Sequence, residues 1–368
     1  MRKKLKIATF VASEVPFPVP EDFKGIYAPA EVALGVAEGL AKRGHEVLFY
    51  GPTGSKSKIC KVREVKIVPL YENEILKSPE VKRVREKISY LFDQYIVSLI
   101  FKENLKEKFD IIHIHPVDRA LPFASLTKTP VVYTLHDPLY PWRAKIFEMY
   151  QTKNQYFISI SDAQRQPAPN LNWAGTVYNG INLESFPFNL RPKNELLFLG
   201  RILERKGPHI AIKAAIKSNE NLIIAGTPSK GKFWEKYIRP FLKRKNIKYV
   251  GFLPYGKTYK LYQEAKALLC PIQWEEPFGL TFIESMACGT PVIAFDRGSA
   301  KEVIKDGKTG FVVKNISEMI KAIKKINQIK RENCRKWVEE NFTIERMVND
   351  TKKYFTELFR EEIEKGSR

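Results

Sequence analysis

The chain has 368 residues, of which 44% are hydrophobic and 28% are charged. These values indicate two globular domains rather than a disordered chain, and no segment offers the roughly 18 uninterrupted apolar residues that an integral membrane protein needs. The formal net charge is +21, which favours polyanions, anionic lipid or phosphorylated ligands as partners without choosing among them. The scattered cysteines, Cys60, Cys270, Cys288 and Cys334, form no CxxC pair, so we expect no disulfide framework, no zinc site and a cytoplasmic location.

The first half of the chain alternates between strand-like and helix-like patterns. The run "KLKIATFVAS" predicts a buried first strand rather than a signal peptide. Apolar residues at helical spacing in "APAEVALGVAEGLAKRG" predict a helix before a second strand at 45–50. Further strands are expected at "KIVPLY", "FDIIHIHP", "PVVYTLHDP", "QYFISIS" and "GTVYNGI", with helices over 79–108 and near 120–126. This alternation predicts a doubly wound parallel sheet in a Rossmann-like α/β domain.

The polar, Pro-containing run "FPFNLRPKNE" interrupts this pattern and marks a boundary between two domains, 1–188 and 189–342. A fresh cycle follows, in which "LLFLG", "NLIIAG", "IKYVGFLP", "ALLCPIQ" and "PVIAF" predict a second α/β sheet. Residues 343–368 carry apolar side chains at helical intervals, and we expect a helix that packs back toward the first domain. Two facing sheets of this kind bind ligands in the cleft beyond the carboxyl ends of their strands.

Two cations follow the first strand of the second domain, in "LGRILERKG". Arg201 comes directly after the strand, and Lys206 stands before Gly207 and Pro208, where a helix is expected to begin. A rigid guanidinium fork and a mobile ammonium form a complementary pair for a diphosphate group. The alternative is that both are ordinary surface cations of a basic protein.

The segment "WEEPFGLTFIESMACG" predicts a turn at Phe278 and Gly279 and a helix that begins at Leu280. The free N–H groups of Leu280 and Thr281 would then face the cleft at the positive end of the helix dipole. Such an arrangement is favourable for binding a phosphate.

Two carboxylates flank this turn. Glu284 lies in or just after the first turn of the helix, where its oxygens can accept hydrogen bonds from a vicinal diol such as a ribose. Glu276 precedes the turn, and its expected partners are hydroxyls or a developing positive charge. Taken singly, each is explained as a solvated acid, but together they favour a site that holds polyol groups on either side of a diphosphate.

In the first domain, His136 ends a predicted strand in "TLHDP", which places it at the cleft. His113 and His115 alternate with isoleucines in "IIHIHP", and we interpret them as structural because a third metal ligand is missing. Gly25 ends the first long loop, where it can bring the backbone close to a phosphate.

The segment "EEPFGLTFIESMACGTPVIAFDRGSAKEVIKDGKTGFVV" resembles the signature region of the retaining family 4 glycosyltransferases, which have the GT-B fold. The resemblance includes their E-x7-E pattern, as Glu276 and Glu284. Supporting segments are "LAKRGHEVLFY", "FDIIHIHP", "YNGINLESF" and "GRILERKG", so the similarity covers most of the chain. The chain departs from the family in its first loop, where Lys24-Gly25-Ile26 replaces the Gly-Gly pair of many relatives.

The resemblance implies roles for these residues. Glu284 would bind the ribose of a nucleotide-sugar donor, Glu276 and His136 the donor sugar, and Arg201 with Lys206 the diphosphate leaving group. It also implies a retaining sugar transfer that requires no metal and no further cofactor, which agrees with the absence of an Asp-x-Asp motif. The acceptor, an unidentified hydroxyl compound, is expected on the first domain.

Three alternatives remain beside a glycosyltransferase. A nucleotide-sugar epimerase would use similar diphosphate contacts but needs acids and bases acting on the sugar ring. A glycogen phosphorylase-like enzyme would need a lysine that holds pyridoxal phosphate. The charge of +21 suggests a nucleic-acid-binding protein, but no recognition motif supports a specific nucleic acid. The same charge leads us to expect peripheral contact with an anionic membrane, at its inner surface.

Overall fold

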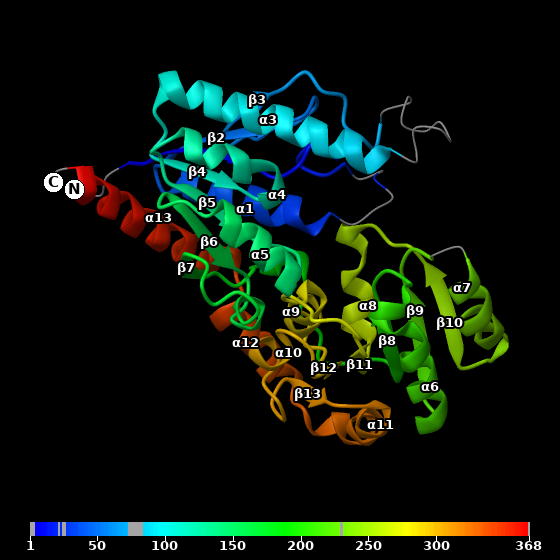
Figure 1. Ribbon diagram of the computed structural model, residues 1–368. Helices are drawn as coiled ribbons and strands as arrows, with labels where there is room; N and C mark the ends of the chain where they lie inside the picture. Colours follow the sequence, from blue (N-terminus) through cyan, green and yellow to red (C-terminus); the bar gives the residue numbers. More distant parts are fainter. Residues whose placement is uncertain (1–3, 21–22, 24–26, 73–83, 229–230, 367–368) are drawn as a thin grey trace.

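The computed structural model describes residues 4–20, 23, 27–72, 84–228 and 231–366. In these ranges the chain forms two α/β domains, each built on a parallel sheet, of seven strands in the first and six in the second (Figure 1). The predicted fold of two doubly wound sheets is therefore confirmed. Within the same ranges, no helix is long and apolar enough to cross a membrane.

The first sheet has the strand order β3-β2-β1-β4-β5-β6-β7. Its order reverses between β1 and β4, which is the point where ligands bind in open α/β sheets. The strands are β1 (Lys6–Phe10), β2 (Glu46–Gly51), β3 (Lys61–Glu64), β4 (Ile111–Ile114), β5 (Val131–Thr134), β6 (Gln155–Ser159) and β7 (Trp173–Thr176).

Helices cover both faces of this sheet. They are α1 (Ala28–Lys42), α3 (Arg85–Glu107), α4 (Val117–Ala120) and α5 (Pro141–Tyr150), with short 3-10 helices at Leu121–Leu126 and Ala163–Arg165. The buried residues of α1 belong to one apolar core, and those of α3, α4 and α5 belong to the core on the other face. The sheet is therefore buried on both sides, which explains its continuous apolar strands.

The second sheet has the order β10-β9-β8-β11-β12-β13, with its reversal between β8 and β11. The strands are β8 (Glu195–Leu199), β9 (Asn221–Ala225), β10 (Ile247–Gly251), β11 (Ala267–Cys270), β12 (Val292–Phe295) and β13 (Gly310–Val313). The helices are α6 (Pro208–Ser218), α7 (Lys232–Tyr237), α8 (Tyr259–Glu264), α9 (Leu280–Ala287), α10 (Ala300–Val303), α11 (Ile316–Lys325) and α12 (Arg331–Asn341), with short 3-10 helices at Leu183–Ser185, Glu204–Lys206, Arg239–Lys243, Tyr255–Lys257 and Ile326–Gln328.

The last helix, α13 (Ile344–Gly366), leaves the second domain and lies along the first (Figure 1). Met347, Val348 and Phe355 are buried in the core that contains α1. A Cβ atom on Gly39 of α1 would lie 2.4 Å from a methyl group of Val348, so only glycine allows the two helices to approach this closely. The C-terminal helix therefore ties the two domains together.

One predicted strand of the first domain was wrong, and another was predicted to extend too far. The run "KIVPLY" is not a strand, because the chain turns at Ile67, whose N–H donates to the carbonyl of Val65, and β3 instead covers Lys61–Glu64. The run "GTVYNGI" is a strand only as far as Thr176. Beyond it, Val177 packs into the first-domain core that contains α1, whereas Tyr178 and Ile181 pack into the core of the second domain. In both cases apolar residues such as Ile67, Leu70 and Ile181 are buried without joining the sheet.

Candidate active site

The carboxyl edge of the first sheet faces the second domain. After β6, the backbone N–H groups of Asp162 and Ala163 donate to the carboxylate of Glu302 in α10, each at 2.7 Å. Nearby, a cavity of about 510 Å³ is lined by both domains, including Phe23, Tyr27 and Glu31 from the first and Lys257 and Leu280 from the second. Gly25, predicted to approach the donor phosphate, lies outside the described residues.

The turns after β8 and β11 lie side by side at the reversal of the second sheet. Gly207 has a φ of +77°, and a Cβ atom there would lie 2.1 Å from the carbonyl oxygen of Pro271. The N–H of Gln273 donates to the carbonyl of Arg205 at 2.8 Å. These contacts hold the turn that carries Lys206 against the turn that carries Glu276.

A compact polar cluster results. The ammonium of Lys206 donates to Oε2 of Glu276 at 2.6 Å, and the indole N–H of Trp274 donates to the same oxygen at 2.9 Å. The Lys206 ammonium also lies 4.7 Å from the centre of the Trp274 ring. Only 21% of the Lys206 side chain and 10% of the Glu276 side chain are exposed, so solvent screens this pair weakly. Sequence reasoning assigned these residues to different parts of a ligand, whereas the structure pairs them directly.

Arg201 stands apart from this pair. It follows β8 and is exposed, and within the described ranges its guanidinium has no ion-pair partner. The neighbouring Arg205 instead stacks on Trp274, with 4.5 Å between the guanidinium carbon and the ring centre. Arg201 is therefore free to bind an anion that enters beside β8.

Helix α9 begins at the predicted turn. Gly279 has a φ of +84°, and a Cβ atom there would lie 2.5 Å from the ring of Phe282. Phe278 is buried beneath the turn, and no side chain in the described part of the chain caps the first N–H groups of the helix. Leu280 lines the interdomain cavity and Thr281 is half-buried. The structure thus provides the uncapped helix terminus that the sequence indicated.

Glu284 lies one turn into α9, and only 5% of this residue is exposed. Its Oε2 accepts a hydrogen bond of 2.7 Å from the hydroxyl of the buried Tyr262. Burial raises the pKa of Glu284 to about 7, because the charged form loses hydration that one hydrogen bond does not replace. The sequence predicted an open ribose-binding acid and did not reveal this tyrosine, which comes from α8.

The first-domain wall of the cleft contains a row of three histidines. His113 and His115 lie at the end of β4, and His136 follows β5, which pairs with β4. A hydrogen bond of 2.7 Å joins Nδ1 of His115 to Nε2 of His136, and another of 2.8 Å joins Nε2 of His113 to the hydroxyl of Thr134. His136 was predicted for the cleft, whereas the contact with His115 was not.

Burial keeps these imidazoles neutral. It lowers the pKa of His113 to about 3 and that of His136 to about 4, and it also lowers the pKa of His115. Although the row brings three rings together, no group of three or more His, Cys, Asp or Glu side chains among the described residues is arranged to hold a metal ion. These histidines are suited to exchange neutral hydrogen bonds with a ligand or with one another.

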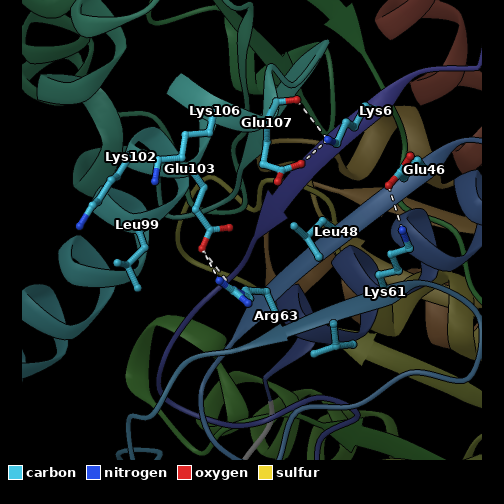
Figure 2. Close-up of a pocket in the computed structure, with 11 residues that line it drawn as sticks. Lys6, Glu46, Leu48, Lys61, Arg63, Leu99, Lys102, Glu103, Lys106 and Glu107 are labelled. Carbon is cyan, nitrogen blue, oxygen red and sulfur yellow. Dashed lines mark hydrogen bonds and ion pairs between the residues drawn. The ribbon is translucent and has the colours of Figure 1, made fainter.

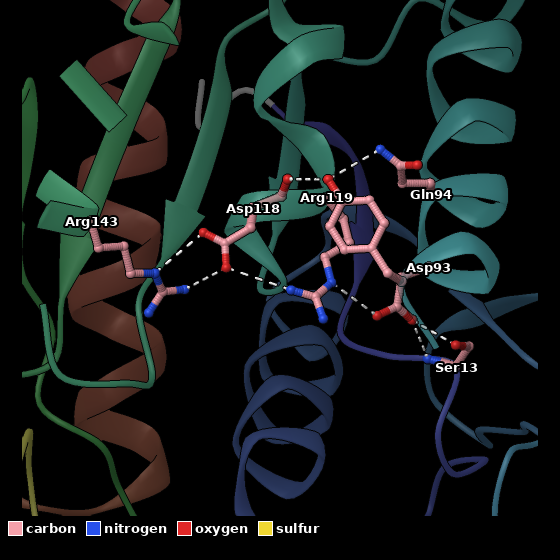
Figure 3. Close-up of polar contacts among 7 residues, drawn as sticks. Ser13, Asp93, Gln94, Asp118, Arg119 and Arg143 are labelled. Atoms are coloured by element: carbon pink, nitrogen blue, oxygen red, sulfur yellow. Dashed lines mark hydrogen bonds and ion pairs between the residues drawn. The ribbon is translucent and has the colours of Figure 1, made fainter. Parts of the chain in front are cut away.

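A chain of alternating charges joins α3, α4 and α5 of the same domain (Figure 3). The carboxylate of the buried Asp93 accepts hydrogen bonds from the N–H and the hydroxyl of Ser13, at 2.8 and 2.6 Å, and pairs with Arg119 at 3.4 Å. Asp118 then links Arg119 to Arg143, with distances of 3.5 and 2.9 Å. This network was not predicted from the sequence. One feature of the sequence indicates it: Asp93 is a charged residue on the apolar face of a predicted helix.

A second hollow, of about 730 Å³, lies at the opposite end of the first sheet (Figure 2). It is lined by Lys6, Glu46 and Lys61, the first residues of β1, β2 and β3. Three of its cations pair with its carboxylates: Lys6 with Glu107, Lys61 with Glu46 at 3.0 Å and Arg63 with Glu103 at 2.8 Å. Because this hollow lies away from the carboxyl edge, where open α/β sheets bind ligands, we place the functional site in the cleft.

Comparisons with known proteins match both halves of the chain to glycosyltransferases. Residues 183–343 match the family model of the glycosyl transferases group 1, and residues 30–185 match that of glycosyltransferase family 4. Among curated proteins, the uncharacterized glycosyltransferase MJ1178 of Methanocaldococcus jannaschii is 29% identical over 311 residues, which span 78% of this chain and 86% of that protein.

Solved structures share the whole architecture. The sucrose-phosphate synthase of Thermosynechococcus elongatus superposes with a TM-score of 0.77 at 18% identity, over 96% of this chain and 99% of that one. Alr3699/HepE of Anabaena, in complex with UDP, superposes with a TM-score of 0.71 at 16% identity, over 96% and 100% of the two chains. The matches to the two glycosyltransferase models together span residues 30–343, and the solved structures share the GT-B fold, so the comparisons support a group 1 glycosyltransferase.

Proposed function

We propose that this glycosyltransferase moves a sugar from a nucleotide-diphosphate donor to a hydroxyl acceptor, with retention of anomeric configuration and without a required metal. The observation that carries this proposal is the pairing of Lys206 with Glu276 beside the uncapped terminus of α9. It supplies a cation, a carboxylate and free N–H groups within one small site, which suits a ligand that is anionic at one end and polyhydroxylated at the other.

The pairing suggests how the donor is received. A diphosphate that enters between Arg201 and α9 offers Lys206 a second anion, so the ammonium can turn from Glu276 toward the phosphate. Trp274 donates to the Glu276 carboxylate at 2.9 Å and keeps it in place during this exchange. Glu276 is then available to the donor sugar and to the positive charge that develops at its reacting carbon.

The sugar–phosphate bond breaks, the acceptor oxygen bonds to the same sugar carbon, and the acceptor's hydroxyl proton passes to an oxygen of the departing diphosphate. Negative charge that develops on the diphosphate is stabilised by Arg201, Lys206 and the N–H groups of α9. We place the acceptor on the first-domain wall. Closure of the cleft around both substrates excludes water and limits hydrolysis of the donor.

His136 contributes a neutral hydrogen-bonding group to this site. Nε2 of His115 is buried and has no partner among the described residues. Since a buried N–H without an acceptor is rarer than an unsatisfied acceptor, we assign the proton of His115 to Nδ1, which then donates to Nε2 of His136. His136 therefore carries its own proton on Nδ1, as a donor for a hydroxyl of the donor sugar.

Structures with related folds support a nucleotide donor without identifying its base. Alr3699/HepE binds UDP, and the catalytic domain of starch synthase IV from Arabidopsis thaliana, which superposes with a TM-score of 0.68, binds ADP and acarbose. In this chain we expect the base near Gly226 and the segment 252–255, beyond the ends of β9 and β10.

Thermal unfolding with UDP-, GDP- and ADP-sugars tests the donor site. A donor present at about 100 times its dissociation constant should raise the unfolding free energy by about 2.7 kcal/mol. Arg201→Ala should lose most of this stabilisation, whereas Arg244→Ala should keep it, since the equally exposed Arg244 lies before β10 at the opposite edge of the sheet. If none of the donors stabilises the protein against thermal unfolding, the proposed donor class is rejected.

Proton NMR of the transfer product then tests retention. With the stabilising donor and a panel of hydroxyl acceptors, the anomeric coupling of the product should match that of the donor. A product of inverted configuration would reject the retaining mechanism but keep the donor site. Full activity in the presence of EDTA is the expected result for a reaction that needs no metal.

A further inference from the structure

Helix α5 exposes a row of large apolar side chains on its outer surface. Trp142 is 63% exposed, Met149 72%, Ile146 40% and Tyr150 39%. The spacings of four, three and one residues place them on one side of the helix. The opposite side carries Ala144 and Phe147, which are buried in the core of the first domain. Helix α5 is therefore apolar on its outer as well as its inner side.

A neighbouring loop extends this surface. Leu126 ends the 3-10 helix that packs beside α5, and it is 68% exposed. The side-chain amide of Asn154 donates to the carbonyls of Thr127 and Thr129, at 2.9 and 3.1 Å, so the loop after α5 is fastened to the loop after Leu126. We call the apolar set of Leu126, Trp142, Ile146, Met149 and Tyr150 the α5 surface.

Cations surround the α5 surface. Lys145 lies within the helix, and Lys128 and Lys153 lie in the two fastened loops; all three are exposed. None of them has an ion-pair partner in the described part of the chain. Helix α5 carries one acidic residue, Glu148. The surface thus joins apolar side chains to an excess of unpaired positive charge, in a chain of net charge +21.

We infer that the α5 surface docks on an anionic lipid bilayer. Tryptophan and tyrosine favour the boundary between headgroups and acyl chains, because one end of the ring is apolar and the other is polar. The apolar residues would enter this boundary while the three lysines meet anionic headgroups, as in helices that lie in the plane of a membrane. A cluster of this size at the surface of a monomer marks an interaction site, and its lysines select an anionic partner.

Helix α5 lies next to the first-domain wall of the cleft, so docking of α5 on a membrane also positions the cleft. The helix begins at Pro141, five residues after His136, and Arg143 in its first turn belongs to the charge chain of the first-domain wall. Docking through Trp142 therefore brings the first-domain wall close to the lipid headgroups. A hydroxyl acceptor carried on a lipid would reach the cleft by this route. The docking itself does not depend on the proposed transfer chemistry.

Sedimentation of the full chain with vesicles tests the inference. At low salt, the protein should bind vesicles of phosphatidylcholine and phosphatidylglycerol in equal amounts far more strongly than vesicles of pure phosphatidylcholine. Trp142→Glu with Met149→Glu should lower the partition coefficient by about 100-fold or more, because each side chain withdrawn from an apolar environment accounts for roughly tenfold. Equal binding of wild type and this double variant would overturn the inference.

The matched control is Leu190→Glu with Ile363→Glu, which has the same change of charge at residues that are 55% and 46% exposed in the second domain and α13. It should bind the anionic vesicles like the wild type. Replacing Lys128, Lys145 and Lys153 with glutamine leaves the apolar residues in place and should weaken anionic binding by about fivefold per lysine. Both sets of variants should unfold at the wild-type temperature, since every altered side chain is solvent-exposed.

Light scattering distinguishes a second copy of the chain from a membrane. The wild type is expected to be monomeric at concentrations where it binds vesicles. A wild-type dimer that the Trp142 and Met149 substitutions dissociate would assign the α5 surface to self-association and overturn membrane docking. If the protein binds vesicles but shows no donor stabilisation, the docking inference stands and the proposed transfer reaction fails.

Discussion

The two walls of the cleft handle charge in opposite ways. The second-domain wall presents Arg201, which has no ion-pair partner among the described residues, and Lys206 paired with Glu276. All three come from turns that follow neighbouring strands. The first-domain wall presents neutral imidazoles, and its arginines are held by Asp93 and Asp118. The second-domain wall is therefore suited to bind an anionic ligand group, whereas the first-domain wall is suited to form hydrogen bonds with an uncharged ligand group. This division suits a charged donor and a hydroxyl acceptor.

The same contrast appears in how the walls respond to pH. In the first-domain wall, burial lowers the pKa of His113 and His136, so acid is expected to destabilise it. In the second-domain wall, burial raises the pKa of Glu284 to about 7. Acid is therefore expected to stabilise the second-domain wall. Between pH 4.5 and 6.5, the contributions of the histidines and of Glu284 to the free energy of unfolding therefore change in opposite directions.

The largest expected effect is the acid sensitivity of the first-domain wall. His113 stabilises the fold fully above pH 6.5, and this contribution is lost as the pH falls toward about 3, the pKa of His113 in the folded protein. The loss is about 1.4 kcal/mol for each pH unit, or about 5 kcal/mol in full. Denaturant unfolding of wild type and His113→Asn at pH 7, 6 and 5 measures it, and the variant should lose less stability on acidification. Parallel pH profiles would show that His113 is not the acid-sensitive group.

The next largest effect is expected from a substitution that removes a cation from the second-domain wall. Lys206→Ala removes a charge that we assign to the departing diphosphate, so the transfer rate should fall by about 10²–10³. Lys213→Ala serves as the control, because Lys213 is an exposed lysine on the neighbouring α6 and should leave the rate unchanged. Steady-state kinetics compares the two variants. A fall of less than about threefold for Lys206→Ala would remove Lys206 from the leaving-group site.

A somewhat smaller effect is expected from Glu284→Gln. The wild-type carboxyl is most stabilising when protonated, below pH 4.5, and this stability is lost as the pH rises to about 7. Glutamine keeps an acceptor for the Tyr262 hydroxyl but carries no charge. The unfolding free energy of the variant should therefore gain about 3 kcal/mol relative to wild type between pH 4.5 and 7. A constant difference over that range would mean that Glu284 is ionised without penalty.

The sequence predicted the second-domain wall better than the first for a physical reason. The turns after its apolar strands carry Arg201, Lys206, Glu276 and Gly279. Because ligands bind beyond the carboxyl ends of parallel strands, the strand positions alone predict that these residues lie together. Their functional roles remain predictions. The pairing of Lys206 with Glu276 depends on the close approach of Gly207 to Pro271, which no local pattern reveals.

The first-domain wall depends on contacts between distant segments. Ser13 and Asp93 are 80 residues apart, and Arg119 and Arg143 come from the starts of different helices. The error at "KIVPLY" has a related cause, since an apolar run predicts burial but does not say whether its backbone joins a sheet. The interdomain contact of Glu302 was missed as well, because a glutamate in a four-residue helix has no distinguishing sequence signal.

That contact provides the smallest expected effect and the most direct way to alter how the two walls meet. Glu302 accepts hydrogen bonds from the N–H groups of Asp162 and Ala163 and from the hydroxyl of Tyr178, at 2.7, 2.7 and 3.1 Å. Glu302→Ala removes these bonds, so the domains should separate more often, and the KM for the donor should rise by about three- to tenfold. Small-angle scattering should show a larger radius of gyration that saturating donor restores.

The matched control for this last variant is Glu318→Ala. Glu318 also accepts a backbone N–H, that of Lys314 at 2.8 Å, but both residues lie within the second domain. Its loss should weaken the start of α11 without changing the radius of gyration or the KM. If Glu302→Ala scatters like Glu318→Ala, then the bonds to Asp162 and Ala163 do not hold the domains together. The two walls would then be positioned by α13 and its packing on α1.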